Sequence, residues 1–104
     1  MPEAVIRLTP DPSRAGATRL VLAGRLGIDA AEELRRTALA AVERGGPVTA
    51  CCAGVESLHA AAVQVLLGLG RELDQRAKPW AVTGGGAADD TLRLGGLIPS
   101  PDGR

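Results

Sequence analysis

Short apolar runs that alternate with helical segments predict an α/β fold for this chain of 104 residues. Two segments repeat apolar residues at helical spacing. A short, nearly all-apolar run between them is typical of a strand buried on both faces of a parallel sheet. We therefore expect a small mixed, mainly parallel sheet of about four to five strands, with helices packed mainly on one face. The length fits one domain, with a core of about residues 4–97 and a flexible tail over 98–104.

Two strand-like runs come first in the chain. Residues 4–9 have the sequence AVIRLT and residues 18–24 have the sequence TRLVLAG, with Pro10, Pro12 and Gly16 between them. Proline and glycine supply the backbone conformations that turns require. We expect a hairpin or two neighbouring strands.

The first helix is predicted over residues 30–44. Asp29 precedes it as the expected N-cap, and Gly45 and Gly46 follow it as a stop signal. Its apolar residues recur at helical spacing, and they are Ala31, Leu34, Ala38, Ala41 and Val42.

Residues 47–53 are too short for a helix and nearly all apolar, so they predict a central strand. Cys51 and Cys52 are adjacent in this strand and should point to opposite faces, which would strain a disulfide between them. We interpret both as small buried apolar residues. A metal site is not expected, because His59 is the only histidine.

The second and longer helix is predicted over residues 60–77, with Val63 and Leu66 in the core. Val65 and Leu69 lie about half a turn away from that face, beside charged residues. They form either an exposed apolar stripe that docks a protein partner, or part of a helix that packs broadly against its neighbours. The sequence leaves both alternatives open.

A last strand is predicted over residues 79–83, and a third helix over residues 89–94 with Asp89 and Asp90 as caps. The loop Gly84, Gly85 and Gly86 between them lacks the Lys-Ser/Thr of a phosphate-binding loop. We therefore interpret it as a plain turn.

Composition excludes several classes of function. Twelve basic residues balance twelve acidic ones, so the chain lacks the positive charge that nucleic-acid binding requires. Neither a signal peptide nor a membrane-spanning run is present, which predicts a cytoplasmic protein. With Trp80 as the single aromatic residue, no deep cofactor pocket is expected. No nucleophile and base pair is evident, so we expect no enzyme and no cofactor.

Two stretches carry a resemblance to a known family. Residues 22–26 (LAGRL) come before the first helix, and residues 55–67 (VESLHAAAVQVLL) extend across the third strand and second helix. In order and spacing they resemble the STAS domain of bacterial anti-sigma factor antagonists. In that family a strand ends in Gly-x-Leu, and Asp-Ser-Ser-Gly opens a helix that continues apolar-x-x-Leu-Leu. The resemblance covers roughly residues 5–97.

The chain departs from this family at the site of phosphorylation. Where the family has Asp-Ser-Ser-Gly, this sequence has His59, Ala60, Ala61 and Ala62. Ala60 matches the phosphorylated Ser or Thr and has no hydroxyl, so the charge-based switch cannot operate there. Ser57 is the nearest hydroxyl and the fallback site. The resemblance implies a non-catalytic regulatory module without phosphorylation at the usual position.

The resemblance also implies a partner surface at the start of the second helix. It comprises His59, Ala60, Ala61 and Ala62, and Val65 and Leu69 would extend it. His59 is either a contact for the partner or, as we favour, a replacement for a capping Asp. The alanines either let a partner approach closely or are simply good helix formers.

Several partners agree with this resemblance. The first is a GHKL-type anti-sigma kinase. The alternatives are the ATPase of a lipid-transport ABC system, with this chain as a small accessory subunit, or a chemotaxis-type signalling protein. A homodimer formed through a sheet edge or through the Val65 and Leu69 stripe is a further alternative.

Overall fold

The computed structural model describes residues 4–84, 86, 89–94 and 96–97. The predicted tail over 98–104 and Gly85 of the glycine loop lie outside the described residues. The strands are β1 (Val5–Pro10), β2 (Thr18–Leu26), β3 (Val48–Leu58) and β4 (Trp80–Thr83). The helices are α1 (Ile28–Glu43), α2 (Ala60–Gln75) and α3 (Asp89–Leu94).

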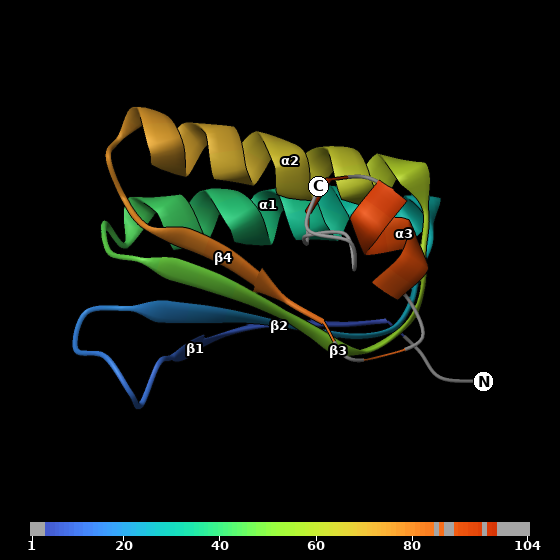
Figure 1. Ribbon diagram of the computed structural model, residues 1–104, viewed down its shortest axis with the longest axis horizontal. Helices are drawn as coiled ribbons and strands as arrows, with labels where there is room; N and C mark the ends of the chain where they lie inside the picture. Colours follow the sequence, from blue (N-terminus) through green and yellow to red (C-terminus); the bar gives the residue numbers. More distant parts are fainter. Residues whose placement is uncertain (1–3, 85, 87–88, 95, 98–104) are drawn as a thin grey trace.

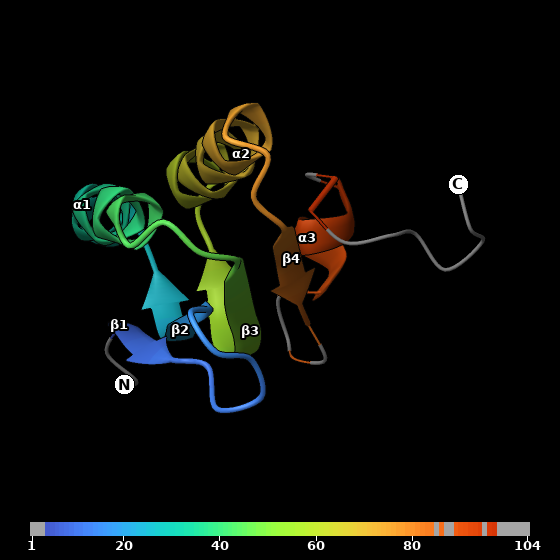
Figure 2. The same ribbon diagram turned by 90° about the vertical axis from the view of Figure 1, so that its left-hand side faces the viewer.

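In the described part of the chain, the strands form a four-stranded sheet in the order β1-β2-β3-β4. β1 and β2 pair antiparallel, whereas β2 with β3 and β3 with β4 pair parallel. α1 and α2 connect the parallel strands and lie side by side over one face, while α3 lies beside β4 (Figures 1 and 2). The predicted mixed, mainly parallel sheet with helices mainly on one face is confirmed.

The core lies between the sheet and the two long helices. The predicted core residues Val63 and Leu66 are both buried, and Leu66 is fully so. Trp80 packs on α2 at Gly70, where a Cβ atom would lie only 2.6 Å from the indole Nε1. The largest fully buried side chains are Leu20, Leu22, Leu26, Leu34, Leu66, Leu73, Leu92, Val48, Val55 and Cys52.

Several element boundaries differ from the prediction, and two of the differences have a clear physical reason. β3 continues past Ala53 to Leu58, because β2 extends to Leu26 and pairs with it as far as Leu58, with two register shifts on the way. α1 begins at Ile28 with Gly27 as its N-cap and no side-chain capping bond. The prediction that Asp29 is the N-cap is therefore wrong. Its carboxylate lies in the first turn, where the helix dipole favours negative charge.

The two cysteines are free and differ in burial, as side chains on opposite faces of a strand do. Cys52 is fully buried, and burial is the main cause that raises the pKa of its thiol to about 11. Cys51 pairs with Val21 of β2 and with Thr83 of β4, and it is half-buried. The expectation that both cysteines are buried is correct for Cys52 only.

Candidate protein-binding surface

His59 holds the start of α2 against the sheet. Its backbone N–H donates to the Leu26 carbonyl at 2.8 Å, which ties the helix start to the end of β2. Its Nδ1 accepts a hydrogen bond from the Ala61 N–H at 3.0 Å. His59 is thus the N-cap of α2, in agreement with our favoured interpretation that it replaces a capping Asp.

Three backbone donors in the first turn of α2 have partners within the protein. Besides the Ala61 bond, the Ala62 and Val63 N–H groups donate to the His59 carbonyl at 2.9 and 3.1 Å. These three N–H groups, which at other helix starts can bind an anion, are therefore used internally here. No acidic residue lies in this turn. The surface is small, uncharged and suited to a close contact rather than to a charged ligand.

Burial separates the residues that the sequence grouped at this helix start. His59 and Ala60 are exposed, and Ala61 is half-buried. Ala62 is fully buried in the core, so its side chain cannot reach a partner and its expected place on this surface is wrong. Ser57 is exposed near the end of β3.

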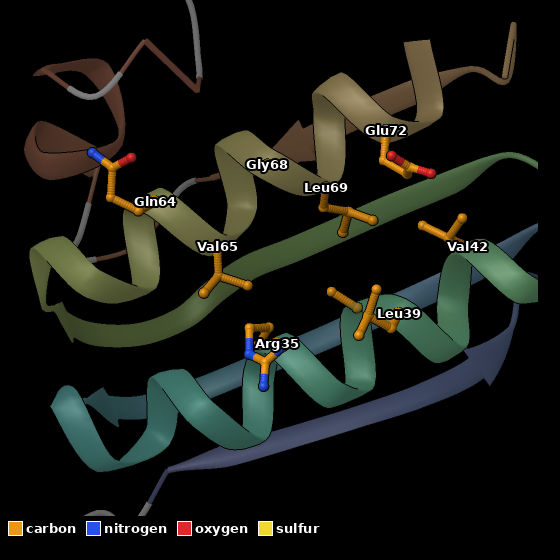
Figure 3. A pocket seen from close by; sticks show the side chains of 9 residues that line it. Arg35, Leu39, Val42, Gln64, Val65, Gly68, Leu69 and Glu72 are labelled. Atoms are coloured by element: carbon orange, nitrogen blue, oxygen red, sulfur yellow. The ribbon is translucent and has the colours of Figure 1, made fainter. Parts of the chain in front are cut away.

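A groove runs along the outer surface between α1 and α2, beyond this helix start (Figure 3). We call it the α1–α2 groove, and its volume is about 440 Å³. Val65 and Leu69 line it from α2, and Leu39 lines it from α1 with 51% of its surface exposed. Its lining residues are Arg35, Ala38, Leu39, Val42, Gln64, Val65, Gly68, Leu69 and Glu72.

Leu69 is buried, with only 4% of its surface exposed, so the expectation that it lies off the core is wrong. The reason is that α2 packs against α1 as well as against the sheet. Broad packing is therefore the correct alternative for Leu69. Val65 is half-buried and keeps an accessible edge in the groove.

Sequence reasoning missed Leu39 and Gly68 as surface features. Leu39 lies one turn after Arg35, outside the apolar pattern that predicted the helix. Gly68 is an exposed glycine inside α2, where glycine is unfavourable. A leucine off the apolar face and a glycine within a helix were the available signals.

Among the described residues, no group of three or more His, Cys, Asp or Glu side chains is placed to hold a metal ion. None of the helices in the described ranges has the length and apolar character to cross a membrane.

Comparison with known proteins identifies related sequences and folds. A family model described as "Mlab, STAS domain" matches residues 11–97. The anti-sigma factor antagonist SpoIIAA in its unphosphorylated form is 20% identical with a TM-score of 0.65, covering 75% of this chain and 71% of that chain. The Bacillus cell fate determinant SpoIIAA in its phosphorylated form is 19% identical with a TM-score of 0.69, covering 89% and 85%. At these identities the structures support the fold alone. Among curated proteins, the search found no match.

Proposed function

The chain belongs to the STAS domain family, and on that premise we propose that it is a non-catalytic regulatory module that binds a protein partner through the start of α2. One observation carries the proposal: this helix start is exposed at His59 and Ala60, has no acidic residue in its first turn, and is hydrogen-bonded to the end of β2. The contacts of His59 with Leu26 and Ala61 fix its position before a partner arrives. A preformed surface loses little conformational entropy on binding, so a small contact can suffice.

The chemistry of the described residues supports a binding role more than a catalytic one. The STAS family is generally non-catalytic. His59 uses its Nδ1 to cap α2. Binding without group transfer requires only the shape and accessibility of His59 and Ala60.

We further propose that this binding is not switched by phosphorylation at the usual position. Ala60 is the first residue of α2 and has no hydroxyl to accept a phosphate. The nearest hydroxyl is that of Ser57, which precedes the His59 cap by two residues and lies on β3. Control would then depend on the amount of the partner or of this chain.

The first candidate partner is a GHKL-type anti-sigma kinase. The second is the ATPase of a lipid-transport ABC system, for which this chain would be a small accessory subunit. Ala60 favours this second candidate, because a permanent subunit needs no phosphate switch at the helix start.

The test is a calorimetric titration of this chain with the candidate kinase and, separately, with the candidate ATPase. Ala60→Glu places a carboxylate on the exposed helix start, where the helix dipole tolerates it, so the variant should stay folded. We expect its affinity to fall at least about tenfold, because binding would desolvate the new charge. Ala40→Glu is the matched control, since Ala40 is exposed on α1 outside the groove.

Two results would contradict the proposal. Unchanged affinity in folded Ala60→Glu would place the partner on another surface. Incubation with the kinase and ATP should leave Ser57 unmodified in mass spectra, and a phosphate on Ser57 would show that the switch persists two residues before His59.

A further inference from the structure

We propose that the face of the sheet turned away from α1 and α2 binds an acidic surface of a protein partner. The two long helices lie over the opposite face, and α3 lies beside β4 (Figure 2). This second surface is separate from the start of α2. We call it the outer sheet face, and its central residues are Arg7, Arg19, Val21, Ala23, Arg25 and Cys51.

The register of the strands brings these side chains to one face. Successive residues of a strand point to opposite faces, and burial alternates without a break along β2 from Thr18 to Leu26. The buried members of this alternation belong to the core under the helices, so the residues between them face outward. Arg7 pairs with Val21, and Val21 pairs with Cys51. These three residues therefore form one row across the outer sheet face.

The sheet and the two long helices carry charge of opposite sign. The four strands contain three arginines, Arg7, Arg19 and Arg25, and one acidic residue, Glu56. In contrast, α1 and α2 together contain six acidic residues and three arginines. The net charge of zero thus conceals a basic sheet under an acidic helical layer. An acidic partner is attracted to the sheet side and repelled from the helix side.

The acidic groups close to this face leave its arginines available. Within the described ranges, neither the three arginines nor Glu56 belongs to an ion pair. The pKa of Arg19 is raised, chiefly by the neighbouring Cys51 and to a smaller extent by Asp11. The Asp11 carboxylate itself accepts hydrogen bonds from the backbone and the hydroxyl of Ser13. Exposed guanidinium groups without a carboxylate partner can bind the carboxylates of another molecule in bidentate geometry.

The composition of the outer sheet face favours a protein over other acidic partners. Three arginines are fewer than the clusters of about four to eight basic residues that hold proteins on anionic membranes. Single-stranded nucleic acids stack on aromatic side chains, whereas Trp80, the single aromatic residue, packs on α2. Small apolar side chains such as Val21 and Ala23 lie among the arginines. Apolar residues at the centre and enrichment in arginine are typical of protein interfaces.

Alkylation of Cys51 by iodoacetamide reports whether this face is covered. Cys51 is half-buried on the outer sheet face, whereas Cys52 is fully buried and has a pKa raised to about 11, so Cys51 should react first. The probe is a ten-residue peptide of alternating Glu and Ser, and the same peptide with Gln in place of Glu is its neutral control. We expect the acidic peptide to slow alkylation of Cys51 in the full chain at least about threefold. The neutral peptide should leave the rate unchanged.

Two variants with the same change of charge locate the contact. Arg7→Glu reverses an exposed charge in the row of Cys51, so it should stay folded by circular dichroism. The peptide concentration that gives half-maximal protection should rise at least about fivefold in this variant. Arg36→Glu, at an exposed position on α1, should behave like the wild type.

Any of three results would overturn the proposal. The first is a rate of Cys51 alkylation that the acidic peptide does not change. The second is protection in folded Arg7→Glu at the same peptide concentration as in the wild type. The third is stronger protection by phosphatidylglycerol vesicles or by a ten-residue oligothymidylate than by the peptide, which would make this face a membrane or nucleic-acid surface instead.

Discussion

Replacing Gly70 with alanine should destabilise this protein, although alanine is the better helix former. Gly70 lies within α2, and a Cβ atom there would be 2.6 Å from Nε1, 3.0 Å from Cδ1 and 3.3 Å from Cε2 of Trp80. Three atoms of a rigid ring cannot all yield by small shifts. The indole must therefore move away from α2, and its contact with the helix is lost.

The magnitude follows from two opposed terms. Replacing glycine with alanine inside a helix raises the free energy of unfolding by about 0.5–1 kcal/mol. Overpacking against a well-placed side chain lowers the free energy of unfolding by about 1–3 kcal/mol. Because the ring is half-exposed and can move, we expect a net loss of about 1 kcal/mol, or about 4–8 °C in Tm for a domain of this size.

Gly68→Ala is the matched control, two residues earlier in the same helix. Its new Cβ meets nothing within 4 Å. Only the gain from replacing glycine in a helix therefore applies, and the free energy of unfolding should rise by about 0.5–1 kcal/mol. Urea unfolding followed by the fluorescence of Trp80, the single tryptophan, measures both variants. Folded Gly70→Ala should also emit at longer wavelength. A Gly70→Ala protein as stable as Gly68→Ala would refute the packing argument.

Three more predictions follow from burial. Leu66→Ala should lose about 2–5 kcal/mol in urea melts, because Leu66 is fully buried; a loss well under 1 kcal/mol would contradict its place in the core. Leu69→Glu should lower Tm steeply by burying a carboxylate, whereas Leu39→Glu, at a half-exposed position, should leave Tm nearly unchanged. The Cys52 pKa is raised from 9.0 to about 11 in the folded protein. The thiol therefore loses its proton at a lower pH in the unfolded chain than in the folded protein, and the free energy of unfolding falls as pH rises between these two pKa values. Urea midpoints of Cys52→Ala should fall less steeply with pH over this range than those of the wild type, and equal slopes would exclude this linkage.

The sequence by itself determined the elements and the class of the fold. Apolar residues recur in α1 and α2 with the period of a helix, and this local periodicity predicts each helix without knowledge of its neighbours. The nearly all-apolar first half of β3 correctly predicted a central strand, but the expectation that both faces of this strand are buried is wrong, because buried and half-buried residues alternate from Val48 to Cys52. The resemblance in residues 22–26 and 55–67 then predicted the family.

The candidate site was predicted only in part. The sequence located the start of α2 and favoured His59 as its cap, since capping depends on residues adjacent in the chain. Which alanine reaches the surface could not be derived, because Ala60 and Ala62 have identical side chains. Ala62 is buried only because the first turn of α2 presents it to the core.

Tertiary structure decided how much of each helix is covered. Periodicity gives the centre of an apolar face but not its width, which depends on where the neighbouring helix lies. α1 packs beside α2, and this contact buries Leu69 while leaving Leu39 half-exposed at the other wall of the same groove. The partners in this contact are separated by β3 in the chain, so no local pattern of residues encodes their distance.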